Sequence, residues 1–141
     1  DFDRIGRYSK DIAEITLQIQ HGKDREFERL PGLPRMVDLT IEMVDRAASG
    51  FVHRDAESVR DLAKTDDAVD ALHDETLRAI VAHMKDGSLA IDVGAWYILV
   101  NRYLERIADH AVNIGEGVVY MVTGERLPRI RAAERARWKS P

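Results

Sequence analysis

Hydrophobic residues recur along most of the chain at intervals of three and four positions, the spacing of an amphipathic helix. This spacing predicts four helices, over residues 1–21, from 34 to 49 or beyond, and over 55–86 and 88–123. Gly22, Gly87 and Gly124 are typical stop signals after three of them. Asp55 and Ser88 are suitable N-caps for the last two. Since no segment alternates long enough to predict a strand and short loops join long helices, we expect an all-α antiparallel bundle.

The predicted third helix carries acidic residues within its apolar stripe. At about 100° per residue, the apolar residues on this face are Val59, Leu62, Ala63, Val69, Leu77, Ile80, Val81 and Met84. Asp66, Asp70 and His73 lie on the same face. A face that is apolar over most of its length packs into the core, so we expect these polar side chains to be buried with it.

The predicted fourth helix has the same feature. Glu105, Asp109 and Glu116 share a face with the apolar residues Ile91, Ile98, Val112 and Val119. Thr123 continues this face at the helix end, and Arg102 lies close by. Two consecutive helices therefore each place an acidic pair at i, i+4 spacing on a face that is expected to be buried. Burying an unpaired carboxylate costs several kcal/mol, so each pair needs a counter-charge.

A bound cation is one source of that counter-charge. Carboxylate oxygens suit hard or borderline ions such as Fe, Mn, Mg, Ca, or Zn with help from a histidine. We predict a metal site with the ligands Asp66, Asp70, Glu105 and Asp109. The residues expected to complete or surround the ligand shell are His73, Arg102, His110 and Asn113.

Neighbouring basic residues are the other source of counter-charge. Arg102 and Arg106 lie beside the acids of the fourth helix. Arg60, Lys64 and Arg78 lie near the acids of the third. Acidic and basic residues three or four positions apart commonly pair on helix surfaces. The spacing alone leaves both explanations open.

The predicted fourth helix has a second apolar side, opposite Glu105. Its residues are Val100, Leu104, Ile107, Ala111, Ile114, Val118 and Met121. A helix that is apolar on two sides is buried on two sides. We expect the second side to pack against another bundle, supplied by an N-terminal half or by a second subunit. Together with Phe2, Ile5 and Ile12, expected to be exposed on the first helix, this surface predicts a homodimer.

Composition narrows the classes of function. The 141 residues include no Cys, which excludes thiolate metal sites and cysteine nucleophiles. The net charge of −4 argues against nucleic acid as the main partner. Residues 125–141 form a basic tail, which we interpret as a solvated terminal segment. No apolar run approaches the roughly 20 residues that span a bilayer, so no membrane insertion is expected.

The start of the chain resembles part of the predicted fourth helix. Asp1–Glu14 reads DFDRIGRYSKDIAE and Tyr103–Glu116 reads YLERIADHAVNIGE. Arg4 and Ile5 match Arg106 and Ile107. A repeat at this distance predicts two copies of one helical unit, of which the first is cut short.

These residues resemble those of the PhoU family of phosphate-uptake regulators. The run RYLERIADHAVNIGEGVVYMVTGE (Arg102–Glu125) is similar to the signature helix of that family, and TDDAVDAL (Thr65–Leu72) resembles its acidic motif. PhoU proteins are tandem three-helix bundles whose acidic motifs bind metal ions. The resemblance implies that residues 1–21 are the last helix of a first repeat and that residues 33–124 are a complete second repeat. It also implies a metal-binding role for Asp66, Asp70, Glu105 and Asp109.

The first repeat departs from the family pattern. Arg7 stands where Asp109 stands, and Tyr8 stands where His110 stands. An arginine cannot ligate a cation, so we expect the Arg7 guanidinium to replace the metal as the partner of the acids in this repeat.

The resemblance implies a cytoplasmic regulator that signals between a phosphate ABC transporter and a sensor histidine kinase. Two other classes compete with it: a di-metal carboxylate enzyme, and a plain helical interaction module whose acids form salt bridges. Ferritin-like di-metal enzymes bring Glu-x-x-His motifs from two helices. No Glu of this sequence has a His three residues later. The sequence therefore favours a regulator that is not an enzyme.

Overall fold

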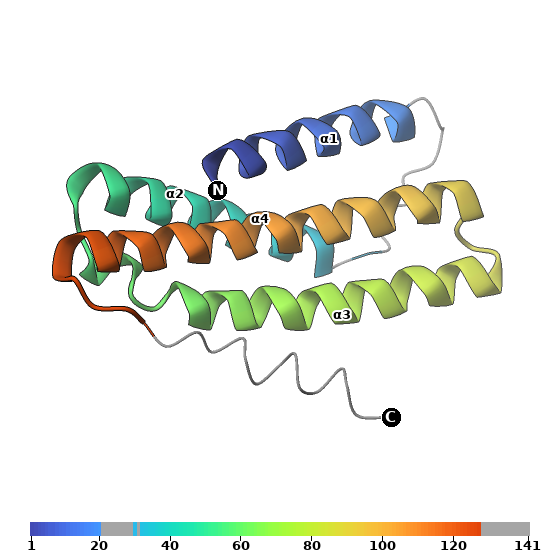
Figure 1. The fold of residues 1–141 in the computed structure, drawn as a ribbon. Coiled ribbons are helices and arrows are strands. Elements are labelled where there is room, and N and C mark those ends of the chain that lie inside the picture. The colour runs from blue at the N-terminus through green and yellow to red at the C-terminus, as the bar shows by residue number, and fades with distance from the viewer. Residues whose placement is uncertain (21–29, 31, 128–141) are drawn as a thin grey trace.

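The protein is described by a computed structural model over residues 1–20, 30 and 32–127. Its elements in chain order are α1 (Phe2–Gln20), α2 (Gly32–His53), the short 3-10 helix η2 (Glu57–Val59), α3 (Leu62–Asp86) and α4 (Ile91–Thr123). Figure 1 shows α2, α3 and α4 side by side with alternating directions, and α1 lying along the outer side of α4. The predicted all-α fold is confirmed, and these ranges contain no strand.

The helix ends follow the turn chemistry of the sequence. Gly87 and Gly124 adopt left-handed backbone conformations, with φ of 77° and 71°, directly after α3 and α4. Glycine accepts this conformation without the clash that a Cβ atom causes, which confirms both residues as helix stops.

Two predicted helix starts are wrong. α3 begins at Leu62 because the residues after Asp55 form the separate helix η2. The Asp55 carboxylate caps η2 instead, accepting hydrogen bonds from the backbone N–H groups of Glu57 (3.1 Å) and Ser58 (3.2 Å). α4 begins at Ile91, because Ser88 is engaged elsewhere: its hydroxyl lies 2.8 Å from the His83 ring nitrogen.

The corner around η2 is held tightly against its neighbours. Arg46 of α2 donates a hydrogen bond of 2.7 Å to the Ser58 carbonyl and also pairs with Asp61. Gly115 of α4 passes so close to α3 that a Cβ atom there would lie 2.8 Å from the Leu62 side chain. The start of α3 is therefore fixed between α2 and α4.

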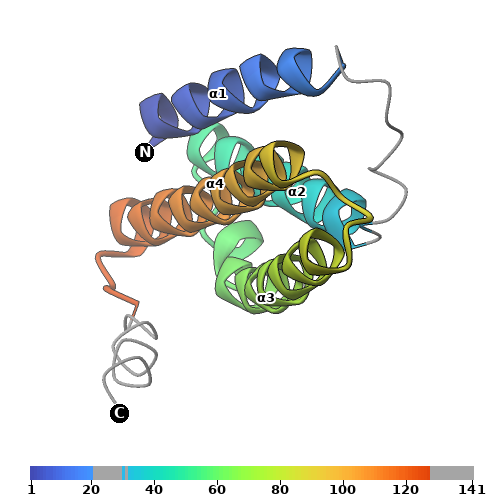
Figure 2. The same ribbon diagram turned by 90° about the vertical axis from the view of Figure 1, so that its right-hand side faces the viewer.

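Helix α4 is the central element of the molecule. It packs against α1, α2 and α3, and Figure 2 shows it between α1 and α3 with α2 beside it. Its predicted burial on two sides is confirmed. Six residues of the second side are buried within one chain: Val100, Leu104, Ile107, Ala111, Ile114 and Val118. The seventh, Met121, is 47% exposed near the end of α4, so its predicted burial is wrong.

Helix α1 covers much of that second side. The predicted exposure of Ile5 and Ile12 is wrong, because Ile5 is buried and Ile12 is partly buried against the core. Both line a groove of about 330 Å³ together with Leu104 and Ile107. The burial of the second side therefore needs no second subunit, and the homodimer stays a prediction.

Two other predicted core residues are exposed. Val81 is 37% exposed and Ile91 is 72% exposed. Val81 lies at the edge of the apolar stripe of α3, next to Ile80, which takes the buried position. Ile91 is the first residue of α4, at the end of the bundle. A helical wheel gives a direction around the helix axis, but it does not say how far neighbouring helices extend along it.

Candidate functional site

The predicted metal ligands lie on two neighbouring helices. Asp66 is buried and Asp70 is half-buried on α3. On α4 the side chains of Glu105 and Asp109 are each only 16% exposed. The periodicity of the sequence therefore placed these carboxylates on the correct faces of their helices.

The acids of α4 have arginine partners on their own helix. Arg102 Nη1 lies 2.8 Å from Glu105 Oε1, and Arg106 Nη1 lies 3.4 Å from Asp109 Oδ2. Arg106 Nε is also 3.8 Å from Glu105 Oε2. These are the i, i+3 and adjacent pairs that the second explanation of the sequence predicts.

The arginine pairs compensate Glu105 incompletely. Burial raises the pKa of Glu105 above its ordinary value of 4.5, and the nearby Asp109 carboxylate raises it further. Arg102, Arg106 and His73 act in the opposite direction but do not cancel the increase. Among the described residues Glu105 Oε2 is buried without a hydrogen-bond donor, so this oxygen is open to a further counter-charge.

The side chains as they stand do not form a metal centre. In residues 1–20, 30 and 32–127, no three His, Asp or Glu side chains are grouped so that they could hold a metal ion. Asp66, Asp70 and Asp109 all take part in interactions within the chain. The oxygens are of the type that hard cations prefer, but their arrangement does not fit such an ion. Metal binding by Asp66, Asp70, Glu105 and Asp109 stays a prediction.

Two of the residues predicted to surround the metal point elsewhere. His110 Nδ1 lies 2.6 Å from the Asp1 carboxylate, and Asn113 Nδ2 lies 3.5 Å from the same oxygen. Both therefore contact the start of α1. Burial lowers the pKa of His110. His73, 18% exposed, lies 3.3 Å from Asp74.

Asn101 is a polar residue that the sequence analysis missed. It is fully buried, and its Nδ2 donates a hydrogen bond of 3.0 Å to the backbone carbonyl of His73. This bond joins α4 to α3 one turn before Glu105. The i, i+4 spacing from Asn101 to Glu105 was a signal that could have revealed it.

The corresponding acid of α1 is paired as expected. Arg7 Nε lies 3.0 Å from Asp3 Oδ2, and the two side chains are 70% and 73% exposed. The expected pairing of Arg7 with this acid is therefore present, and the replacement of a metal by Arg7 stays a prediction.

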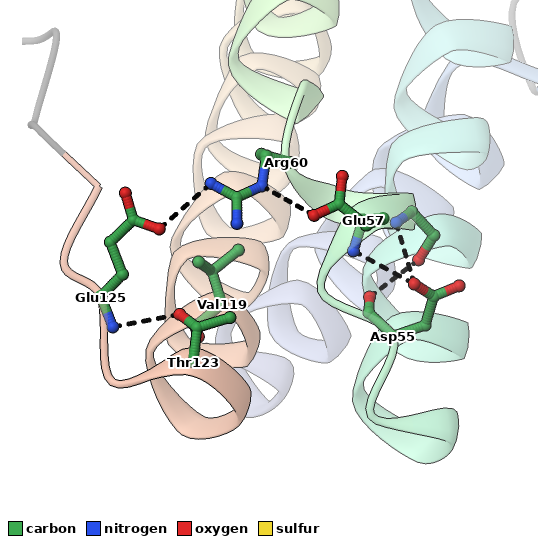
Figure 3. A network of polar contacts seen from close by, with 7 residues as sticks. Asp55, Glu57, Arg60, Val119, Thr123 and Glu125 are labelled. Carbon is green, nitrogen blue, oxygen red and sulfur yellow. Dashed lines mark hydrogen bonds and ion pairs between the residues drawn. The ribbon is translucent and has the colours of Figure 1, made fainter.

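A polar network joins the end of α4 to the η2 corner (Figure 3). Arg60 lies 3.2 Å from Glu57 and 3.3 Å from Glu125. The Thr123 hydroxyl donates to the Val119 carbonyl and accepts a hydrogen bond from the Glu125 backbone N–H. Arg60 is therefore engaged away from the third-helix acids for which the sequence suggested it. The basic tail beyond residue 127 lies outside the described residues.

None of the described helices combines the length and the apolar character that a membrane-crossing helix requires.

The sequence is similar to known proteins of one family. The profile described as "PhoU domain" matches residues 33–118. The "Phosphate-specific transport system accessory protein PhoU homolog 1" of Thermotoga maritima is 35% identical over 90% of this chain and 54% of its own length. The protein of the same name from Methanothermobacter thermautotrophicus is 32% identical over 87% of this chain and 56% of its own length. The chain spans about half the length of these curated relatives. No solved structure matched the chain.

Proposed function

This chain belongs to the PhoU family, and from that premise we propose that it is an accessory regulator of phosphate transport. The observation that carries the proposal is the family match over residues 33–118, which includes α3, nearly all of α2 and most of α4. Relatives that match about nine-tenths of the chain are named as phosphate-specific transport system accessory proteins. An accessory role also suits a bundle of packed helices, because such a bundle supplies surfaces for partners.

The partners we propose are a phosphate ABC transporter and a sensor histidine kinase, and the protein would bind both of them in the cytoplasm. Binding to another protein needs an exposed surface with some apolar character. Helix α2 offers Ile41, Phe51 and Val52, which are 56%, 50% and 71% exposed. A homodimer is proposed on the same basis, since the apolar side chains that remain exposed are available to a second copy.

The proposed role is not catalytic. The carboxylates of α4 are engaged by arginines, and the sequence lacks the Glu-x-x-His pairs of di-metal enzymes. An assay of oxygen-dependent oxidation, run on protein purified without chelator, distinguishes the two classes. A turnover that depends on bound metal would favour the enzyme.

A cellular experiment tests the regulatory role. The chain is expressed in bacteria that lack their own PhoU gene, and phosphate uptake and a kinase-dependent reporter are measured at high phosphate. We expect both to shift toward the values of cells that have PhoU. A variant with Phe51→Asp and Val52→Asp should lose the effect while keeping its helical circular dichroism spectrum. Values equal to those of an empty vector would contradict the proposal.

Metal binding is a second proposal, supported by the family resemblance and by the raised pKa and open oxygen of Glu105. We propose that a divalent or trivalent cation binds to Asp66, Asp70, Glu105 and Asp109. Asp66→Asn should reduce the metal content of protein purified without chelator. Asp67→Asn, which changes an exposed neighbour in the same turn, should leave it unchanged. Equal metal content in both variants and the wild type would exclude this site.

A further inference from the structure

The acid pair of α4 is matched in formal charge by two arginines of the same helix. Glu105 and Asp109 contribute two negative charges, and Arg102 and Arg106 contribute two positive charges within 2.8 to 3.8 Å. All four residues belong to one helix. No metal ion is therefore needed to balance the charge of this pair.

The two kinds of side chain differ in their freedom to move. The carboxylates are 16% exposed, whereas the arginines are 43% exposed. A long arginine side chain at the surface can turn into water and keep its charge solvated. The short, largely covered carboxylates cannot leave their position in the same way. A change of partner at this site would therefore move the arginines.

As they stand, the described side chains do not form a metal centre, because arginines already pair with the acids. We therefore propose that Arg102 and Arg106 occupy the place of a cation. A metal ion then binds to Glu105 and Asp109 only by displacing the two arginines. The proposal deepens the metal-binding role proposed above and rests on it for the wild-type protein. A guanidinium and a metal ion repel each other and compete for the same oxygen lone pairs. The arginines thus set the metal affinity of the site without being ligands.

The first repeat supports this reading of the arginines. At the position of Asp109 it has Arg7, and the Arg7 guanidinium is paired with Asp3 at 3.0 Å. Both copies of the unit therefore use an arginine of the same helix as the counter-ion of the leading acid. In α4 the second acid is retained, so a site remains once the arginines are removed.

The test measures the binding of Mn²⁺ alone, by the loss of the free Mn²⁺ electron paramagnetic resonance signal. The main variant carries Arg102→Gln and Arg106→Gln. The matched control carries Arg4→Gln and Arg7→Gln, which removes the same charge from α1. We expect the main variant to bind Mn²⁺ about tenfold more tightly than the wild type. The control should differ from the wild type by less than about twofold, because exposed charges are screened by salt.

The outcomes separate the two proposals. Tight binding by the main variant supports the inference, even if the wild type binds too weakly to detect. Tight wild-type binding with an unchanged or weaker main variant overturns the inference and leaves the metal proposal standing. An absence of binding in both proteins overturns both, while the accessory role remains open to the cellular test.

A second measurement covers the case in which the main variant does not fold. In the wild type, the arginine Nε–H signals in nuclear magnetic resonance spectra are followed during titration with Mg²⁺. The signals of Arg102 and Arg106 should lose their ion-paired character, whereas that of Arg60 should stay constant. Unchanged Arg102 and Arg106 signals at saturating Mg²⁺ would overturn the inference.

Discussion

Asp1–Glu14 and Tyr103–Glu116 share a sequence pattern but occupy different environments. The first segment forms most of α1, which lies on the outer side of α4, whereas the second lies in α4, which packs against three helices. The leading acid of the first segment, Asp3, is 73% exposed, and its counterpart Glu105 is 16% exposed. Similar residues at similar spacing thus form a solvated surface pair in one copy and a partly buried cluster in the other.

This difference indicates what burial adds to a motif. In both copies an arginine of the same helix faces the acid at 2.8 to 3.0 Å. Burial raises the pKa of Glu105. The helices packed around the motif therefore decide its chemistry. They remove water from the carboxylate, and a desolvated carboxylate needs a stronger counter-charge than an exposed one.

The largest expected effect comes from a charge placed on the second side of α4. Ile107 is buried in the region that α1 covers, so Ile107→Asp would bury an unpaired carboxylate. We expect a loss of at least about 3 kcal/mol of stability, or failure to fold. The measurement is urea unfolding followed by circular dichroism. Leu17→Asp on α1, where Leu17 is 58% exposed, is the control and should change stability by less than about 0.5 kcal/mol. Similar unfolding curves for both variants would show that α1 does not cover α4.

Alanine substitutions at one glycine of α4 and one glycine of α1 are expected to have smaller effects on stability, of opposite sign. A Cβ atom at Gly115 would lie 2.8 Å from Leu62 Cδ1, whereas at Gly6 it would meet no atom within 4 Å. Gly115→Ala should lower stability by about 1 to 2 kcal/mol, since overpacking outweighs the better helix propensity of alanine. Gly6→Ala should raise it by up to about 1 kcal/mol. Thermal unfolding of the two variants checks both signs, and a gain in stability for Gly115→Ala would contradict the close packing of α4 on α3.

The fold was largely predictable because periodicity is a property of the sequence itself. The repeated apolar spacing predicted four helices and the two-sided burial of α4. The helix η2 was missed, since three residues are too few to show a period. The burial of Ile5 and Ile12 was also missed. The sequence showed that a second apolar side existed, but it did not show that α1 would be the element that covers it.

The sequence predicted which helix faces carry the acidic residues of the candidate site, but it did not predict which partner each acid contacts. Helical spacing placed Asp66 and Glu105 on covered faces, because direction around a helix follows from residue number. Whether Glu105 meets a cation or Arg102 depends on side-chain rotamers, which spacing does not determine. His110 and Asn113 were assigned to the metal shell, but they contact Asp1, since α1 approaches that side of α4.

The next prediction concerns the pH dependence of stability. Because the pKa of Glu105 is raised in the folded state, the folded protein holds more protons at this site than the unfolded chain in the pH range between about 4.5 and the raised pKa. The contribution of Glu105 to stability therefore falls as the pH rises from 4.5 through its raised pKa, and then stays constant. Glu105→Gln removes this fall, so the variant should gain stability relative to the wild type between pH 4.5 and neutral pH. Parallel stability–pH curves, measured by urea unfolding, would show that burial does not perturb Glu105.

The smallest expected effect belongs to the ion pair of α1. Arg7 and Asp3 lie only 3.0 Å apart, yet both side chains are more than two-thirds exposed. Water screens such a pair, and holding two long side chains in place costs entropy, so Arg7→Gln should lower stability by about 0.2 to 0.5 kcal/mol. The loss should disappear in about 1 M salt, where charges a few ångströms apart are already screened. A loss above about 1 kcal/mol that persists in high salt would mean that Asp3 is shielded from water, as Glu105 is. The contrast between the two copies of the motif would then rest on their partners alone and not on burial.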